Sequence, residues 1–320
     1  MRKVLGVFFF FCVLVIVVSV ANPRFLGTDN LRNQGRWIGE FGIVSLGEGL
    51  VIITGGIDLS VGSVIALVAT ALPLLLTEYD FPVLFAVICV LSIATSLGLI
   101  HGLLITKMRL QPFVVTLCGL FVYRGVTRVF AGDLTQGYGT GFETLFLLVK
   151  GHLFGLPMPL VLLLCATLVI GVFLHRTVHG RYLLALGRNE QAARYSGIRT
   201  DRMIIIAYTL CGTCAGVSGV LLSLDINSMQ PSNFGSFYEL YAIAAAVLGG
   251  CSLRGGEGHV LGIVLGTAIL RILLNAIILL RIPSSAEFAV IGGVLLLGVT
   301  TDEFVKRYAA RRRAAQRAPS

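Results

Sequence analysis

The sequence predicts an all-α, polytopic membrane protein with about ten transmembrane helices and with both termini in the cytoplasm. Of the 320 residues, 56% are hydrophobic and only 13% are charged, and the mean hydropathy is +0.90. Apolar runs long enough to cross a bilayer recur along the chain. The net charge of +9 lies largely in a few loops and the tail, so we interpret it as a topology signal and expect no nucleic-acid partner.

The first apolar run, residues 4–21, follows Arg2 and Lys3 and is predicted to be a retained span that runs outward. It also has the outline of a signal peptide, which is the alternative. The connection at 22–37 should then face outward although it contains three arginines, which argues against this orientation or indicates a re-entrant segment. Further spans are expected at about 38–54, 60–77, 82–105, 111–130, 203–224, 240–250, 258–280 and 286–300. One more span is expected to follow an external loop at 131–156 and to end at about residue 174.

A helix break is predicted where Thr-Gly-Gly-Ile-Asp-Leu-Ser-Val-Gly, residues 54–62, separates two of these spans. Gly55 and Gly56 weaken the helix, and the side chains of Asp58 and Ser60 can cap the helix that follows. Freed backbone groups inside a bilayer are tolerated where they line a cavity or are buried in protein, which favours a place in a translocation pathway. The alternative is a surface turn that Asp58 caps, without substrate contact.

Acids within apolar runs are candidates for function. Glu48 lies midway along its run and is assigned to the pathway, whereas Glu40 is expected at the membrane interface. His101 is expected to be a packing residue with satisfied hydrogen bonds. Arg128 is expected to snorkel to the outer headgroups.

A second glycine-rich interruption, Gly-Gly-Cys-Ser-Leu-Arg-Gly-Gly at 249–256, repeats the pattern of the first. Paired interruptions of this kind often flank a transport pathway, although chance similarity between glycine-rich turns is an alternative. Gly258, Gly262 and Gly266 are expected to form a helix-packing or subunit-packing face.

The loop at 175–202 is strongly basic and is predicted to be cytoplasmic. Residues 187–198 within it predict a short helix with Asn189 as N-cap and Gly197 as its stop. Such a helix can dock into the groove of a partner, or it can be an amphipathic connector on the membrane surface. The chain is therefore divided into a transmembrane domain at 1–305, which includes this loop, and a basic cytoplasmic tail at 306–320.

Enzymatic chemistry is not expected. The seven cysteines lie mostly in apolar runs, and Cys211-Gly-Thr-Cys214 lies inside a span, so small packing residues are the favoured interpretation. The sequence contains neither histidines with metal-ligand spacing nor a phosphate-binding loop. We expect no metal and no cofactor.

Several motifs in a fixed order make the chain resemble the ribose-type sugar permease family, the membrane-spanning subunits of bacterial ATP-binding cassette importers. They are Gly-Gly-Ile-Asp-Leu-Ser-Val-Gly-Ser (55–63), Gly-Leu-Leu-Ile (102–105), Gln-Pro-Phe (111–113), Arg-Gly (124–125), Asn-Glu-x-Ala-Ala (189–193), Ser-Gly-Ile (196–198), Tyr-Glu-Leu (238–240) and Leu-Gly-Gly-x-Ser-Leu-x-Gly-Gly (248–256).

The resemblance implies a pathway for a monosaccharide through the bacterial inner membrane, formed with a second permease subunit that is identical or related. It also implies cytoplasmic ATP-binding subunits and an extracytoplasmic sugar-binding protein as partners. The segment with Asn189, Glu190, Ala192, Ala193 and Gly197 is similar to the helix that seats in the ATPase. The chain departs from the family pattern at His101, Met108 and Tyr241, and Glu48 is unusual, which leaves the sugar open.

Two other functions are compatible with the residues. An ion-coupled secondary transporter would use Asp58 or Glu48 to bind a proton or sodium ion. A permease for another small polar solute, such as a branched-chain amino acid, is a further alternative. A membrane-embedded enzyme or scaffold is the least supported class, because no catalytic arrangement is present in the sequence.

Overall fold

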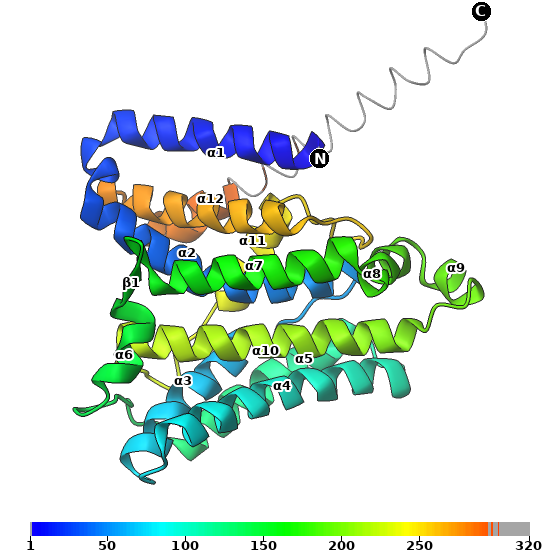
Figure 1. Ribbon diagram of the computed structural model, residues 1–320, viewed down its shortest axis with the longest axis horizontal. Helices are drawn as coiled ribbons and strands as arrows, with labels where there is room; N and C mark the ends of the chain where they lie inside the picture. The colour runs from blue at the N-terminus through cyan, green and yellow to red at the C-terminus, as the bar shows by residue number, and fades with distance from the viewer. Residues whose placement is uncertain (1, 294–295, 297–299, 301–320) are drawn as a thin grey trace, which may run out of the picture.

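The computed structural model describes residues 2–293, 296 and 300. Nearly every element is a helix, and most helices lie along one common direction (Figure 1). Two ends of the bundle serve as reference points: the α9 end and the α6 end, at the right and left of Figure 1. The predicted basic tail at 306–320 lies outside the described residues, as do residues 294–295 and 297–299 of the predicted span at 286–300.

The first third of the chain contains the central helix. Helix α1 (Arg2–Ala21) and the short η1 (Pro23–Leu26) lead into α2 (Thr28–Ile53), which is followed by α3 (Val61–Thr77). Helix α2 begins ten residues earlier than the span expected at 38–54, so residues 28–37 continue the helix rather than forming a loop. From Gly39 to Ile53 every residue of α2 is buried, which makes it the core helix of the bundle.

The middle of the chain passes along the bundle and carries a small subdomain at the α6 end. Helices α4 (Val83–Lys107) and α5 (Pro112–Phe130) are followed by α6 (Glu143–Lys150) and an antiparallel hairpin of β1 (His152–Leu153) and β2 (Leu156–Pro157). The segment at 131–156, predicted only as an external loop, therefore has structure of its own. Helix α7 (Met158–Arg176) returns along the bundle to the α9 end.

At the α9 end, α8 (Val178–Arg188) and α9 (Glu190–Tyr195) precede the long α10 (Thr200–Ile226). The short α11 (Tyr238–Leu248) and then α12 (Val260–Leu279) follow, with η2 (Ser284–Ala286) leading into a helix that starts at Glu287. Asn227 ends α10 and Phe237 starts α11 in the left-handed backbone conformation, so two tight turns limit the connecting loop.

Small residues bring the inner helices close together. Gly98 of α4 packs directly on Gly212 of α10, and a methyl group added to either glycine would meet backbone atoms of the other helix. Gly47 of α2 contacts Cys211 and Cys214 of α10 in the same way. Cys211 and Cys214 are buried and pack between these helices, as expected for small apolar residues, whereas Cys118 and Cys165 are exposed.

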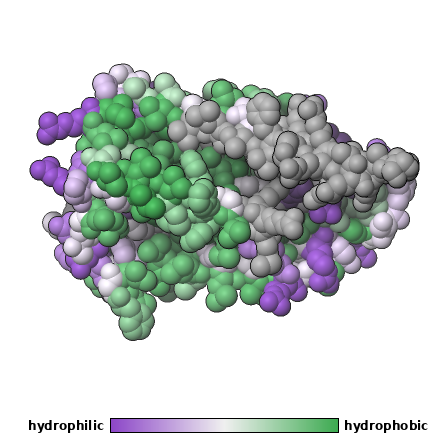
Figure 2. All heavy atoms as spheres, turned by 90° about the horizontal axis from the view of Figure 1, so that it is seen from above, coloured by the Kyte–Doolittle hydropathy of each residue, from purple (hydrophilic) through white to green (hydrophobic). Residues whose placement is uncertain are grey.

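The outer helices expose apolar side chains along their lengths. Six of the described helices are long and apolar enough to cross a membrane: α1, α4, α5, α7, α10 and α12. On α1, Leu5, Phe8 and Phe9 are exposed, and Figure 2 shows hydrophobic side chains over this face with hydrophilic ones towards the ends. A surface of this kind requires lipid around it, so the chain is a multi-pass membrane protein.

Candidate functional site

The predicted break after α2 is present, since the helix ends at Ile53 and α3 starts at Val61. Gly55 adopts a φ of 88°, which side chains other than hydrogen rarely tolerate. Gly56 has no room for a Cβ atom because the Tyr208 hydroxyl and the Val51 side chain fill that space. Both glycines are therefore required by the geometry of the break.

Asp58 is the buried centre of the break, with 2% of its surface exposed. Its Oδ1 accepts hydrogen bonds from the Ser60 backbone N–H at 2.9 Å and from the Ser60 hydroxyl at 2.6 Å. The expectation that Ser60 caps α3 with its side chain is wrong: its hydroxyl donates to Asp58 and makes no cap bond to the described helix. Asp58 itself is the residue that orders the start of α3.

His101 of α4 faces Asp58, with 3.7 Å between its Nδ1 and the Asp58 Oδ2. This distance is too long for a hydrogen bond, so the two side chains are neighbours in the buried core without a direct bond. On the other side of the ring, Nε2 is hydrogen-bonded to the Tyr123 hydroxyl of α5 at 2.7 Å. His101 is thus more than the packing residue that was expected, because it joins the break to α4 and α5.

Glu48 connects the break to the core of α2. It is completely buried, and its Oε1 accepts from the Asp58 backbone N–H at 3.1 Å. The Cys211 thiol donates to its Oε2 at 3.8 Å. The Tyr208 hydroxyl is buried nearby without a hydrogen-bond partner among the described residues.

We call this group the inner polar cluster. It comprises Glu48, Asp58, Ser60, His101, Tyr123, Tyr208 and Cys211. The sequence pointed to Glu48, Asp58 and Ser60 only. The other four lie on helices far along the chain, where a single His, Tyr or Cys in an apolar run has no distinguishing pattern.

The glycine-rich segment between α11 and α12 meets the first break directly. Gly256 donates a backbone hydrogen bond to the Ile53 carbonyl at 2.9 Å, and Gly255 packs against Gly55. Gly250, Gly255 and Gly256 all have positive φ values. The predicted pair of interruptions is therefore one contiguous structure of irregular backbone in the bundle.

Helix α8 closes this junction from the α9 end. Gly187 packs against the Ile53 carbonyl and the Gly256 backbone, and a Cβ atom at Gly187 would overlap both. The backbones at Gly187, Ile53 and Gly256 therefore touch directly, because glycine has no side chain that would separate them.

Helix α9 is a single short helix at the tip of this end, as residues 187–198 predicted. The Asn189 side chain accepts from the Ala192 N–H at 2.9 Å, and Gly197 ends the turn with a φ of 82°. Arg194 binds Glu190 at 2.9 Å and Asp201 at 3.2 Å, while Ala193 is buried.

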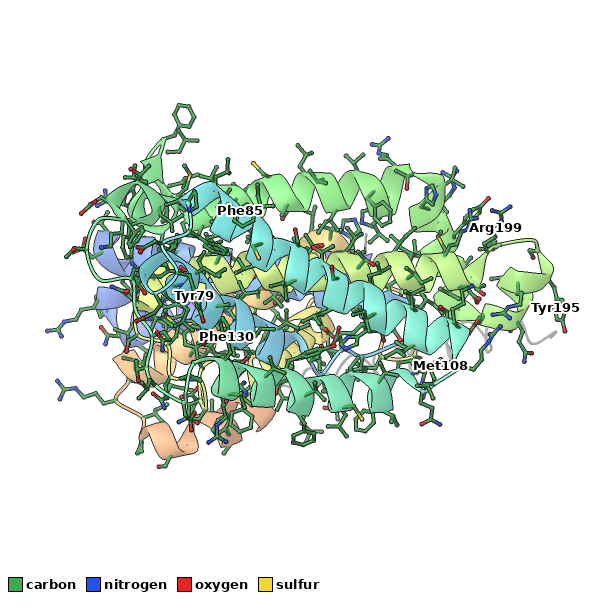
Figure 3. All side chains as sticks on the ribbon, turned by 90° about the horizontal axis from the view of Figure 1, so that it is seen from below. Tyr79, Phe85, Met108, Phe130, Tyr195 and Arg199 are labelled. Atoms are coloured by element: carbon green, nitrogen blue, oxygen red, sulfur yellow. The ribbon has the colours of Figure 1, made fainter. Side chains whose placement is uncertain are left out.

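Tyr195 is the most exposed large side chain of this tip, with 90% of its surface accessible, and it projects from α9 (Figure 3). Figure 3 also shows Met108 and Arg199 at this end, while Tyr79 and Phe130 stack at the opposite end. Of the predicted docking residues, Glu190 is engaged within the chain and Ala193 faces inward. Tyr195 is the surface feature that the sequence analysis missed.

The glycines assigned to a packing face divide into two kinds. Gly262 and Gly266 of α12 lie against the backbone of α11 at Gly249 and Ala245, so they do pack helices together within the chain. Gly258 precedes α12, whose N-cap is His259, and contacts Ile53 instead. The expectation that all three share a face of one helix is wrong for Gly258.

Three further charged residues, Glu40, Arg124 and Arg128, differ in their surroundings. Glu40 is completely buried among helices of the chain, and its expected place at the membrane interface stays a prediction. Arg124 donates to the Pro231 carbonyl at 3.1 Å and to the Phe234 carbonyl, which fastens the loop before α11 to α5. Arg128 is half-exposed, as snorkelling requires, and pairs with Asp133 at 2.6 Å.

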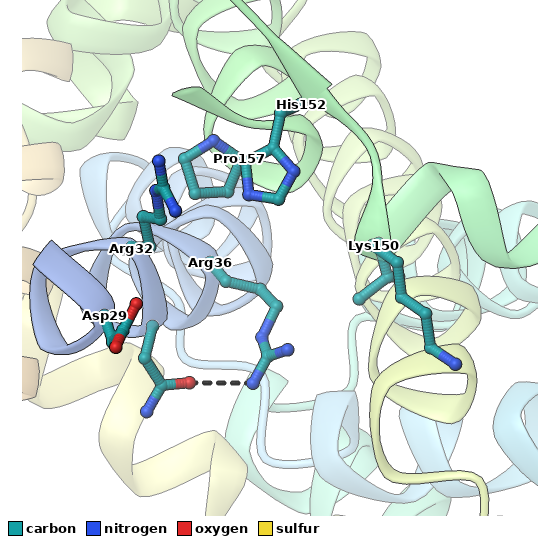
Figure 4. Close-up of a pocket in the computed structure, with 8 residues that line it drawn as sticks. Asp29, Arg32, Arg36, Lys150, His152 and Pro157 are labelled. Carbon is teal, nitrogen blue, oxygen red and sulfur yellow. Dashed lines mark hydrogen bonds between the residues drawn. The ribbon is translucent and has the colours of Figure 1, made fainter. Parts of the chain in front are cut away.

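A basic pocket of about 260 Å³ lies at the α6 end, and two of the three arginines of the connection at 22–37 line it (Figure 4). Arg32, Arg36, Lys150 and His152 contribute to its lining, together with Asp29. Arg36 donates to Asn33 at 2.7 Å and forms an ion pair with Asp225 at 3.1 Å. Part of the positive charge on this connection is therefore neutralised by α10.

Comparison with known proteins gives a consistent result over nearly the whole chain. Residues 32–299 match the family described as branched-chain amino acid transport system / permease component. The chain is 40% identical to the ribose import permease protein of Bacillus subtilis over 93% of its own length and 92% of the relative. It is 37% identical to the ribose import permease protein of Escherichia coli K12, over 91% and 90% of the two chains.

A relative named for a different sugar also matches. The chain is 34% identical to the L-arabinose transport system permease protein of Escherichia coli K12, over 94% of its own length and 91% of the relative. No solved structure matches significantly.

Proposed function

Because the chain belongs to the branched-chain amino acid transport system / permease component family, we propose that it is the membrane subunit of an ATP-binding cassette importer for a ribose-type monosaccharide. The observation that carries this proposal is the 40% identity to a ribose import permease over 93% of the chain. The family description names amino acids, but the relatives at 34–40% identity are named for ribose and L-arabinose. A sugar is therefore favoured over a branched-chain amino acid.

The inner polar cluster supports a pathway and gate in this region. Polar and ionisable side chains within a membrane are costly and are usually retained for function. Here Glu48, Asp58 and Ser60 surround irregular backbone at Gly55 and Gly56, in the middle of a buried core. We assign the gate to these five residues, with His101 holding the break against α4.

The α9 tip is assigned to docking of a cytoplasmic ATP-binding subunit. Asn189, Ala192 and Gly197 shape the helix, Glu190 and Ala193 stabilise it from within, and Tyr195 presents its ring to the partner. The junction at Gly187 then places α8 in contact with both interruptions. Movement of α8 upon ATP binding would reach the gate through backbone contacts alone.

The membrane topology that fits this function has ten spans, with the α9 end and both termini in the cytoplasm. To the six long apolar helices it adds α2, the shorter apolar α3 and α11, and the helix that starts at Glu287. The arginines around α8 and α9 favour a cytoplasmic position for this end. A second permease subunit and an extracytoplasmic sugar-binding protein would complete the transporter in the inner membrane.

Reconstitution tests the function. The chain is purified in mild detergent with its co-purifying ATPase, placed in liposomes and supplied with binding proteins loaded with ribose, L-arabinose or leucine. We expect ATP-dependent uptake of one of the sugars. Uptake of leucine alone would show that the substrate is an amino acid and not a sugar. Uptake driven by an ion gradient without ATP would establish a secondary transporter instead.

A further inference from the structure

The half of the bundle towards the α6 end contains a second group of buried polar side chains, separate from the inner polar cluster. Trp37, Glu40 and Phe41 lie on the same face of α2 as Glu48, because spacings of three, four and eleven residues return to one side of a helix. Glu40 and Glu48 are eight residues apart, about 12 Å along the helix axis. One face of α2 therefore leads from this second group to the gate.

Glu40 is the first sign that the second group is incomplete. Its side chain is completely buried, and neither carboxylate oxygen has a hydrogen-bond partner among the described residues. Its backbone carbonyl accepts a hydrogen bond from the Ser218 hydroxyl at 2.8 Å. A buried carboxylate without hydrogen-bond partners is costly, so both oxygens are free to accept hydrogen bonds from a further group.

Arg271 of α12 is the second sign. Its guanidinium carbon lies 4.5 Å from the centre of the Trp37 ring and 5.3 Å from that of Phe41. Its Nε is buried without a hydrogen-bond partner among the described residues. The guanidinium thus covers two aromatic faces while leaving part of its hydrogen-bonding capacity unused.

Tyr241 of α11 completes the group. Its hydroxyl donates to Glu287 at 3.0 Å, and its ring lies 6.4 Å from that of Phe41. Three helices, α2, α11 and α12, therefore bring together aromatic faces, a carboxylate, a guanidinium and a phenol. We call Trp37, Glu40, Phe41, Tyr241 and Arg271 the outer cluster.

We propose that the outer cluster is a binding subsite for the monosaccharide on its way to the gate. Arg271 would swing aside so that the apolar face of the sugar ring stacks on Trp37. Sugar hydroxyls would donate to Glu40 and accept from Arg271 and Tyr241. This inference rests on the proposed function and names the residues that contact the sugar.

The charges of the cluster favour a neutral polyol. An anion would meet Glu40 and a cation would meet Arg271, whereas hydroxyl groups donate to one and accept from the other. An amino acid zwitterion also matches both charges. The sugar is preferred because the similar proteins are sugar permeases, and the test includes leucine to separate the two.

Trp37 gives a direct readout because it is the only tryptophan in the chain. The full-length permease is titrated with ribose or L-arabinose while its tryptophan emission is recorded, with sucrose of equal osmolality as the control. We expect a saturable change for a monosaccharide but not for sucrose, and a weakened response in Tyr241→Phe. A response to leucine and not to either sugar would overturn the assignment.

The second test of the sugar subsite measures transport by the complete transporter. Glu40→Gln and Arg271→Lys should each lower the sugar moved per ATP hydrolysed about tenfold, as expected for one lost polar contact. Glu143→Gln and Arg128→Lys, exposed at the α6 end, are the matched controls and should retain the wild-type ratio. ATPase stimulation by the loaded binding protein should persist in all four variants.

The outcomes separate the two proposals. Normal sugar transport in Glu40→Gln and Arg271→Lys, together with an unresponsive Trp37, would overturn the subsite and leave the proposed function standing. A parallel loss of melting temperature, transport and ATPase activity would assign the cluster a purely structural role. A wild-type complex that moves no sugar would overturn both proposals.

Discussion

Asp58 joins two tasks that a substitution can separate. Its Oδ1 orders the start of α3 through Ser60, and its Oδ2 faces His101. The first task needs a hydrogen-bond acceptor, whereas the second depends on negative charge. An amide at this position keeps the acceptor and removes the charge.

Asp58→Asn is therefore expected to fold normally and to transport poorly, by about tenfold if one charged contact holds the gate. Asp58→Leu removes the acceptor as well and should lower the stability by about 1–3 kcal/mol, because the buried Ser60 groups lose their partner. Uptake and thermal melting in detergent measure the two effects. Equal uptake in Asp58→Asn and wild type would restrict Asp58 to a structural cap.

His101→Leu should destabilise the protein by about 1–3 kcal/mol, because the Tyr123 hydroxyl loses its hydrogen-bond partner. The measurement is the melting temperature of the purified chain. His152→Leu, on the exposed hairpin at the α6 end, is the matched control and should melt like wild type. An unchanged melting temperature in His101→Leu would show that the histidine does not stabilise the fold.

The limits of prediction at this scale follow from sequence distance. Asp58 and Ser60 lie beside glycines in one short motif, so the pattern is visible. His101, Tyr123 and Tyr208 become partners only when α4, α5 and α10 pack on the break. The contacts of Glu40 and Arg271 were not predictable for the same reason, because helices that are distant in the chain bury these side chains.

At the scale of elements, helix α8 contacts both glycine-rich interruptions directly through its backbone at Gly187. Gly187 allows three backbones to touch, and any side chain would separate them. We expect Gly187→Ala to retain the ATPase subunit and its hydrolysis while transport falls at least tenfold, because α8 can no longer follow the gate. Hydrolysis and uptake are measured on the same liposomes.

Gly171→Ala is the matched control for this variant. It replaces a glycine within α7, where the nearest atom to the new Cβ lies 4.0 Å away. Its transport should equal that of wild type. Normal transport in Gly187→Ala would show that α8 is not part of the coupling route.

Docking of the ATP-binding subunit is tested at α9. Tyr195→Ala should reduce the amount of ATPase that co-purifies with the permease, because a large exposed aromatic ring is a typical anchor of an interface. Tyr79→Ala, at the opposite end of the bundle, is the control. Equal co-purification of the two variants would place the contact elsewhere on this end.

Helix breaks were predictable because glycine pairs and polar residues interrupt apolar runs at 54–62 and 249–256. The early start of α2, by contrast, was hidden by its polar first turns, Asp29 to Arg36. The same holds for α6 and the hairpin, which are too short to give a periodic signal. Polar segments of a membrane protein thus carry structure that hydropathy does not reveal.

For the whole molecule, length and composition establish a multi-pass membrane protein, and six of the described helices are long and apolar enough to cross a membrane. Helices α3 and α11 are short because each adjoins an interruption, and α2 combines polar turns with its buried core. In the proposed topology α2 is a span, and its burial among other helices makes its acids tolerable. Which end of the bundle faces the cytoplasm is tested by labelling from each side of the membrane.

Accessible cysteines at the two ends determine this orientation. Thr140 lies in the exposed loop at the α6 end, and Ser196 ends α9. We expect Thr140→Cys to react with a membrane-impermeant maleimide on intact spheroplasts, and Ser196→Cys to react only after the membrane is permeabilised, because the basic α9 end should be cytoplasmic. The unsubstituted chain, with seven cysteines of its own, gives the background. The reverse pattern would place α9 outside the cytoplasm, where a cytoplasmic ATPase cannot reach it. That result would contradict the proposal that the ATP-binding subunit docks on α9.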